Sequence, residues 1–232
     1  MLLDGSCHCA GGGGISARAR RFACAHLERR RASFLFMRAD NNRMTISAVL
    51  LAGGKSRRMG RDKATIMFRG QPLWKIQLEL LRRLELTEIL VSAKSDPPWR
   101  PADVEFVPDK QPSRGPLSGI AAALLRIKSD HLLALAIDTP FISEAYLRNL
   151  CARIETGRGV VPTIENRAEP LAAIYPRNAE AEVTFALMGN DFSLQPIVQK
   201  LIGLGKLRPI QVSIEERELL RNLNEPQDLG VA

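Results

Sequence analysis

The densest run of residues able to do chemistry lies between positions 51 and 63. It reads Leu-Ala-Gly-Gly-Lys-Ser-Arg-Arg-Met-Gly-Arg-Asp-Lys. The adjacent glycines Gly53 and Gly54 let backbone amides approach an anion closely. The run also carries enough positive charge to neutralise a triphosphate, on Lys55, Arg57, Arg58 and Lys63. We therefore predict a nucleotide-binding loop, the alternative being a glycine-containing turn with solvated basic side chains.

This loop differs from two common phosphate-binding motifs. It contains no G-x-x-x-x-G-K-[ST], and the stretch from Gly53 to Gly60 does not fit G-x-G-x-x-G. A Walker-type ATPase and a dinucleotide-binding Rossmann enzyme are therefore both disfavoured.

Asp138 is the second candidate, because it directly follows the apolar run 132–137 and precedes Thr139-Pro140. A carboxylate at the carboxyl end of a strand, facing a phosphate loop, is well placed to hold Mg²⁺. Magnesium prefers one or two carboxylates together with phosphate oxygens and water. Asp138 could also cap the following turn, and the two roles are compatible.

Asp109 precedes a polar loop, so it can contact a bound nucleotide, support the metal or simply be solvated. The next helix begins at residues 115–119, Gly-Pro-Leu-Ser-Gly, where free backbone amides favour an anion. Near the C-terminus, Asn222 and Asn224 alternate and so project to one side of an extended segment. They could read a polar heterocycle together, although Asn224 could equally be a helix N-cap. No Ser/His/Asp or Cys/His arrangement emerges, which argues against covalent hydrolysis.

Strand-like and helix-like runs alternate from Thr45 onward, which predicts β-α units and a mainly parallel sheet. The expected strands are 46–51, 88–92, 104–107, 131–137, 159–162, 170–175 and 209–212. The expected helices are 72–84, 115–127, 143–154, 179–187 and 193–204. The half beyond Cys151 should extend the same sheet. Because ligands bind beyond the carboxyl ends of such strands, the glycine loop, Asp109 and Asp138 should meet at one edge.

Charge is unevenly distributed along the chain. The formal net charge is +8, and residues 1–44 hold eight arginines against three acidic residues. The remainder keeps 25 of the 33 basic and 22 of the 25 acidic residues, a net of +3. Such a small excess suits anionic small molecules, so nucleic acid is not required as a partner.

Three of the four cysteines lie in the first 43 residues, which leaves Cys151 alone in the body. The body therefore cannot build a disulfide framework, and we expect a reducing, cytoplasmic location. No window approaches the ~18 apolar residues of a membrane span. Residues 1–43 are predicted to be a disordered extension, a transit peptide or a stretch upstream of the natural start at Met44.

Four ordered motifs together resemble the nucleotidyltransferase family with the signature L-A-G-G/A-x-S-x-R-M-G-x-x-K, and specifically the molybdenum cofactor guanylyltransferases. The resemblance spans about 44–228, and its blocks are 51–63, 115–119, 138–141 and 222–226. Related cytidylyltransferases more often carry Ala at the position of Gly53 and another sequence at 115–117. Both differences favour guanine over cytosine.

The resemblance implies a single Rossmann-like, three-layer α/β/α nucleotidyltransferase domain over 44–232 with a mostly parallel central sheet. It also implies transfer of GMP from GTP to the terminal phosphate of molybdopterin, with release of pyrophosphate and formation of molybdopterin guanine dinucleotide. By similarity the cofactor is Mg²⁺, held by Asp138. The implied partners are GTP, molybdopterin and molybdoenzyme chaperones or cofactor-insertion proteins, for a monomer or weak homo-oligomer.

Residue roles follow from the same resemblance. The catalytic set is Lys63, Asp138 and Arg58, and the pterin end belongs to Asn222 and Asn224. GTP contacts are implied for Leu51, Ala52, Gly53, Gly54, Lys63, Ser92, Asp109 and Asp138. Ser92 stands where the family commonly has a longer asparagine, so its contact with the nucleotide is the weakest carry-over.

Three other functions compete with this interpretation. The same loop could serve a cytidylyl- or sugar-type nucleotidyltransferase. The chain could also hold GTP or the molybdenum cofactor without catalysis, but a pure binder has no need for both Lys63 and Asp138. Nucleic-acid binding through the basic leader predicts an affinity that falls steeply with salt.

Overall fold

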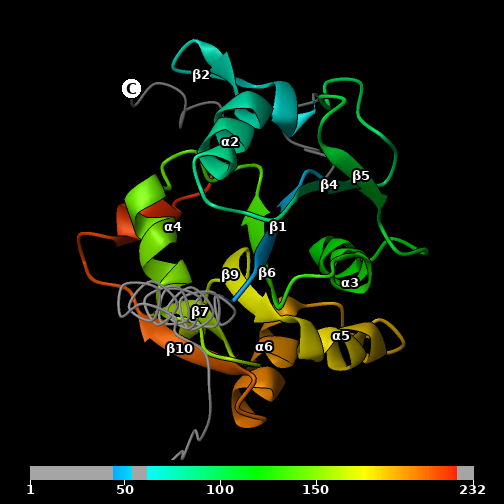
Figure 1. Cartoon of the computed structure of the whole chain (residues 1–232), viewed down its shortest axis with the longest axis vertical. Coiled ribbons are helices and arrows are strands. Elements are labelled where there is room, and N and C mark those ends of the chain that lie inside the picture. The colour runs from blue at the N-terminus through cyan, green and yellow to red at the C-terminus, as the bar shows by residue number, and fades with distance from the viewer. Residues whose placement is uncertain (1–43, 54–61, 224–232) are drawn as a thin grey trace, which may run out of the picture. The chain divides into compact units, whose positions relative to one another are not determined.

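The structure is a computed structural model, which describes residues 44–53 and 62–223 (Figure 1). The chain's contacts separate residues 44–232, as one compact unit, from residues 1–43. The predictions made for residues 1–43 lie outside the described residues.

An eight-stranded sheet forms the centre of the unit, in the order β10-β7-β9-β6-β1-β4-β5, with β8 paired to β7. All strands of the main path run parallel except β9, which is antiparallel to both β6 and β7. The predicted mostly parallel sheet is thus confirmed. The strands are β1 (Ile46–Leu51), β4 (Ile89–Ala93), β5 (Glu105–Pro108), β6 (His131–Ala136), β7 (Gly159–Ile164), β8 (Arg167–Ala168), β9 (Ala172–Pro176) and β10 (Leu207–Gln211).

Helices cover both faces of the sheet, which confirms the three-layer α/β/α architecture (Figure 1). Alternation along β1 separates the two cores, since Ala48 and Leu50 pack on one face while Val49 and Leu51 pack on the other. The first face carries α2 (Leu73–Arg82) and α4 (Glu144–Cys151). The second carries α3 (Pro116–Arg126), α5 (Glu180–Ala186) and α6 (Leu194–Gly203).

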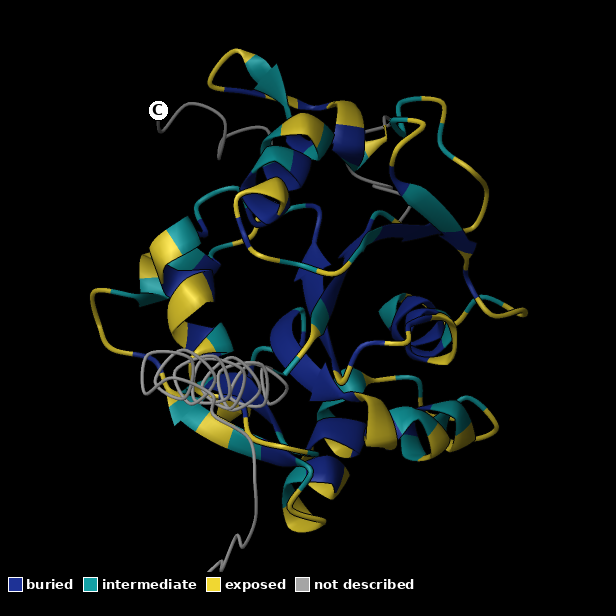
Figure 2. Ribbon diagram, in the orientation of Figure 1, coloured by how far each residue is buried: buried dark blue, intermediate teal, exposed yellow. Residues whose placement is uncertain are grey.

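Burial follows the position of each element in these layers. The central strands β1 and β6 are almost wholly buried, as is most of α3, whereas α2, α4 and α6 each bury one side and expose the other (Figure 2). Fully buried strands read as continuous apolar runs, which explains why 46–51 and 131–137 were recognisable without alternation. No helix among the described residues is long and apolar enough to cross a membrane.

Short elements depart from the sequence prediction. Residues 67–72 form a hairpin of β2 (Met67–Phe68) and β3 (Gln71–Pro72). Pro72 therefore ends a strand and caps α2 in extended conformation, rather than lying in the first helical turn. The turn at Arg69 and Gly70 has positive φ at both residues, as two-residue hairpins require. The 3-10 helices are η1 (Lys63–Thr65), η2 (Arg177–Ala179) and η3 (Arg217–Leu220).

Candidate active site

The predicted site elements meet at one edge because the parallel strands end in register. Leu51 at the end of β1 is paired with Ser92 on β4 and with Ala136 on β6. Ala93 is paired with Pro108 at the end of β5. The segments that follow these strands begin side by side, and they carry Gly53, Asp109 and Asp138.

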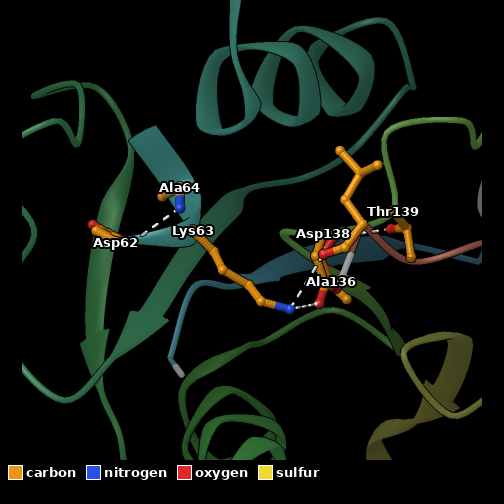
Figure 3. A network of polar contacts seen from close by, with 7 residues as sticks. Asp62, Lys63, Ala64, Ala136, Asp138 and Thr139 are labelled. Atoms are coloured by element: carbon orange, nitrogen blue, oxygen red, sulfur yellow. Dashed lines mark hydrogen bonds and ion pairs between the residues drawn. The ribbon is translucent and has the colours of Figure 1, made fainter. Parts of the chain in front are cut away.

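Lys63 and Asp138 meet at this edge (Figure 3). The Lys63 ammonium lies 2.7 Å from Oδ2 of Asp138, with the two side chains 20% and 18% exposed. Lys63 also donates to the carbonyl of Leu223 at 3.4 Å, and the Leu223 amide donates to the carbonyl of Asp138 at 2.8 Å. Two loops and the C-terminal segment are thereby joined around one cation and one carboxylate, both still reachable from solvent.

The neighbours of this pair hold its backbone in place. Asp62 caps η1 by accepting from the Ala64 amide, and its other oxygen accepts from the Trp99 indole at 3.0 Å. Trp99 in turn stacks on Trp74, with ring centroids 5.7 Å apart. On the other side, the Thr139 hydroxyl donates to the carbonyl of Ala136 and closes the turn after β6. Lys63 and Asp138 are thus presented from fixed positions.

A second cluster surrounds Asp109, which is only 5% exposed. Ser92 donates to one carboxylate oxygen at 3.0 Å, and Ser113 donates to the other at 2.8 Å. Gly53 lies against the same group, since a Cβ there would lie 3.3 Å from Oδ2 of Asp109. The solvated alternative for Asp109 is therefore wrong. The short side chain of Ser92 contacts this buried carboxylate and orients it.

The start of α3 approaches β1 and β4 closely. A Cβ at Gly119 would lie 2.6 Å from Cδ2 of Leu51 and 3.0 Å from Oγ of Ser92. Gly115 caps the helix with φ +71°, a conformation that favours glycine. The Ser118 hydroxyl accepts from the Arg114 amide. Gly115 is thus needed for the backbone conformation and Gly119 for the close packing. Together they bring the helix N-terminus to the edge that carries Asp109.

On the other side of Asp138 the structure has a cavity of about 530 Å³. Its wall includes Thr139, Asn222, Glu169, Gln195 and Phe192. Asn222 is exposed while the next residue, Leu223, is buried in the core, so the expected alternation holds at these two positions. Asn222 therefore lies in the wall of a cavity next to the Lys63 and Asp138 pair.

The placement of the predicted residues divides them into two sides. Leu51, Ala52, Gly53, Ser92 and Asp109 lie at the ends of β1, β4 and β5. Asn222 lies on the β6, β8 and β9 side, and Lys63 with Asp138 lies between the two groups. Gly54, Arg58 and Asn224 lie outside the described residues, so their predicted roles stay predictions.

Sequence reasoning missed several residues of this site. Ser113 belongs to no motif, and a serine in a Pro-containing loop has no evident role from sequence alone. Its contact with the buried Asp109 carboxylate is visible only in the structure. Trp99 lies 37 positions from Asp62 along the chain, so no local motif indicated that the two side chains are in contact. Glu169 follows a two-residue strand that no periodicity could indicate, although its place directly before Pro170 and Leu171 was visible.

The donor set at Asp138 fits a metal ion that arrives with a ligand. Among the described residues, no group of three or more His, Cys, Asp or Glu side chains is placed to hold a metal. Asp138 is a single carboxylate, and one of its oxygens already receives the Lys63 ammonium. One carboxylate suffices for Mg²⁺ only when phosphate oxygens and water complete the shell. The residues therefore fit a nucleotide-borne Mg²⁺ better than a permanently resident ion.

Known proteins of similar sequence share most of this chain. A protein of *Opitutus terrae* named "Probable molybdenum cofactor guanylyltransferase" is 35% identical over 81% of this chain and 94% of its own length. The molybdenum cofactor guanylyltransferase of *Pseudomonas fluorescens* is 35% identical over 82% of this chain and 95% of its own. Both alignments cover nearly the whole of the relative.

Solved structures share the fold. Molybdopterin-guanine dinucleotide biosynthesis protein A from *Archaeoglobus fulgidus* matches with a TM-score of 0.64 and 22% identity, over 79% of this chain and 95% of that protein. A 4-diphosphocytidyl-2C-methyl-D-erythritol synthase from *Anaerococcus prevotii* matches with a TM-score of 0.62 and 13% identity, over 80% and 93%. The model of the MobA-like NTP transferase domain matches residues 48–203. Because this model matches more than half of the chain, and because Lys63, Asp138 and Asp109 meet at one edge of the sheet, the chain belongs to the MobA-like NTP transferase family.

Proposed function

We propose that this protein transfers GMP from GTP to the terminal phosphate of molybdopterin, releasing pyrophosphate and forming molybdopterin guanine dinucleotide. The relatives named molybdenum cofactor guanylyltransferase, aligned over about four fifths of the chain, support this assignment. The observation that carries it is the approach of Lys63 to Asp138 at 2.7 Å, between a nucleotide side and an open cavity.

On the nucleotide side, Leu51, Ala52 and Gly53 line the guanine site in this proposal. Asp109, held by Ser92 and Ser113, faces the nucleoside. Two donors already orient its carboxylate, so little reorganisation is needed when GTP binds. Gly53 leaves room beside this carboxylate, and a larger residue would approach it to 3.3 Å.

Lys63 acts on the phosphates. An in-line attack of one phosphate on another faces charge repulsion, and a fixed ammonium at the reacting centre offsets it. The attacking phosphate is already ionised, so no general base is required. In the structure Asp138 balances the charge of Lys63, and in this proposal the anionic substrates take over that balance on binding.

Asp138 is the proposed ligand of Mg²⁺. The bound ion supplies positive charge to the triphosphate and to the pyrophosphate that leaves. Arg58 is proposed as a further cation at the phosphates, and Gly54 as a backbone contact to GTP.

Asn222 and Asn224 are proposed for the pterin end, in the cavity beside Asp138. In this proposal the acceptor phosphate lies at Thr139 and the ring lies toward the residues of β8 and α6 that line the same cavity. Residues 44–232 are proposed as the nucleotidyltransferase domain of a cytoplasmic protein that delivers its product to molybdoenzyme chaperones or cofactor-insertion proteins.

A substrate competition tests the proposal directly. The purified protein is given molybdopterin, Mg²⁺ and equal concentrations of GTP, CTP and ATP, and the dinucleotide products are separated by mass spectrometry. We expect the guanine dinucleotide to dominate and EDTA to abolish its formation, with recovery on adding Mg²⁺. A dominant cytosine product would reassign the enzyme as a cytidylyltransferase, and binding without pyrophosphate release would indicate a carrier.

A further inference from the structure

Glu169 is a carboxylate in the wall of the cavity beside Asp138 that neither the fold nor the proposed nucleotide chemistry uses. It follows β8 directly and precedes Pro170. Within the described residues its carboxylate has no hydrogen bond and no ion pair. Its oxygens therefore keep their capacity to accept hydrogen bonds from a ligand that enters the cavity.

The backbone around Glu169 is held firmly. Its amide donates to the carbonyl of Pro162 at 2.8 Å. The Gln195 side chain pairs with Ala168 on both sides, donating to its carbonyl at 2.8 Å and accepting from its amide at 3.3 Å. The main chain at Glu169 is thus anchored, and its carboxylate projects from a defined position with unused capacity to accept hydrogen bonds.

The surroundings of the carboxylate favour a flat, hydrogen-bond-donating ligand. Phe192 lines the same cavity, and the Arg114 guanidinium lies 4.3 Å from its ring centroid. An aromatic ring in the cavity wall offers a surface against which a heterocycle can pack. The Asn222 side chain in the same wall adds a polar group for orientation, whereas the Gln195 amide is already bonded to Ala168.

One charged neighbour affects Glu169. Burial raises the pKa of its carboxyl, and the charge of Arg167 partly offsets this shift. The Glu169 charge is also felt by the Tyr146 hydroxyl on α4. Among the described residues, Arg167 is therefore the cation whose charge acts on this carboxylate.

We propose that Glu169 recognises the acceptor of the transfer by accepting from the N3–H and 2-amino groups of its pterin ring. These two N–H groups lie side by side on one edge, and they match the two oxygens of a carboxylate as a guanidinium does. The inference rests on the proposed function, because it assumes that the acceptor is a pterin.

The test compares the full-length protein with Glu169→Gln and, as a matched control, Glu165→Gln. Glu165 lies in the same β7–β8 hairpin but is exposed and outside the cavity wall. We expect E169Q to raise KM for molybdopterin about tenfold or more and to leave KM for GTP within twofold. E165Q should change neither value. A role in folding alone would instead lower the melting temperature and leave both KM values unchanged.

Competition between two ring systems gives a second readout. Lumazine carries an oxo group where pterin carries the 2-amino group, so a carboxylate accepts one hydrogen bond fewer and meets an oxygen instead. The native protein should be inhibited by pterin at about tenfold lower concentration than by lumazine. E169Q should lose that preference, because a glutamine amide can donate to the oxo group. An unchanged preference in E169Q, or none in the native protein, would overturn the assignment.

The two proposals can fail separately. If the native protein transfers no GMP to molybdopterin, the proposed function fails. Equilibrium dialysis of pterin and lumazine against the native and E169Q proteins still decides the role of Glu169 in that case. If transfer is normal in the native protein and KM for molybdopterin is unchanged in E169Q, only the role of Glu169 fails.

Discussion

At the scale of single residues, the site depends on charges that balance one another. Lys63 and Asp138 form an ion pair at the open end of the sheet, and Asp109 lies buried between two serine hydroxyls. These two carboxylates have different tasks in the proposed mechanism. In that mechanism Asp138 exchanges its lysine for a metal and Lys63 turns to the phosphates, whereas Asp109 is already satisfied and fixed in orientation.

Replacing Lys63 or Asp138 by alanine should therefore abolish catalysis without unfolding the protein. We expect kcat to fall on the order of 10²-fold or more for each variant, because each loses a charge at the reacting phosphates. The protein should still fold, since the two side chains are 20% and 18% exposed and water can reach the charge that is left behind.

Steady-state kinetics and thermal melting check this prediction. Lys75→Ala is the matched control, because Lys75 lies in an exposed ion pair with Glu79 on α2. Full activity in either K63A or D138A would contradict the proposed mechanism.

At the scale of elements, the sequence predicted those with strong periodicity or continuous burial. The strands near 46–51 and 131–137 and the helices that cover them are where the apolar pattern placed them. The hairpin of β2 and β3 and the short β8 were not predicted. Two-residue strands have no measurable period, and their pairing depends on neighbours that the local sequence does not specify.

The contact between β7 and β9 gives a prediction at this scale. A Cβ on Gly159 would lie 1.8 Å from the backbone carbonyl oxygen of Ile174, so the two strands would have to separate. We expect Gly159→Ala to lower the free energy of unfolding by about 3 kcal/mol, which corresponds to roughly 6–12 °C in melting temperature.

Denaturant unfolding measures this loss. Gly203→Ala is the control, since a Cβ there meets nothing within 4 Å at the end of α6. It should leave stability unchanged or raise it slightly. Equal stability of G159A and the native protein would contradict the close approach.

At the scale of the whole molecule, one sheet joins the two proposed substrate sides. The proposed nucleotide side lies at the ends of β1, β4 and β5, the cavity lies in the β8 and β9 region, and β6 connects the two. The sequence predicted both sides from ordered motifs. It did not predict the cavity wall, because Glu169, Gln195 and Phe192 come together only through the pairing of β7, β8 and β9 and the packing of α6.

Removing residues 1–43 tests which part of the chain carries the function. The family model matches residues 48–203, and most of the excess of basic over acidic residues lies upstream of this region. We expect a protein that begins at Met44 to keep kcat and melting temperature within error of the full chain. Any affinity of the full chain for DNA should be lost with residues 1–43 and should fall steeply with salt.

GMP-transfer assays and DNA binding at several salt concentrations measure these properties side by side. A large loss of kcat on truncation would assign a catalytic contribution to the first 43 residues. DNA affinity retained by the shorter protein would place a nucleic-acid surface on the domain itself.

The stack of Trp74 on Trp99 has a practical consequence for following the enzyme. These are the only two tryptophans of the chain, and the Trp99 indole is hydrogen-bonded to Asp62, the residue before Lys63. Tryptophan fluorescence of the protein thus originates from one spot beside the proposed phosphate site. The molecule carries its own optical probe of substrate arrival, with no label attached.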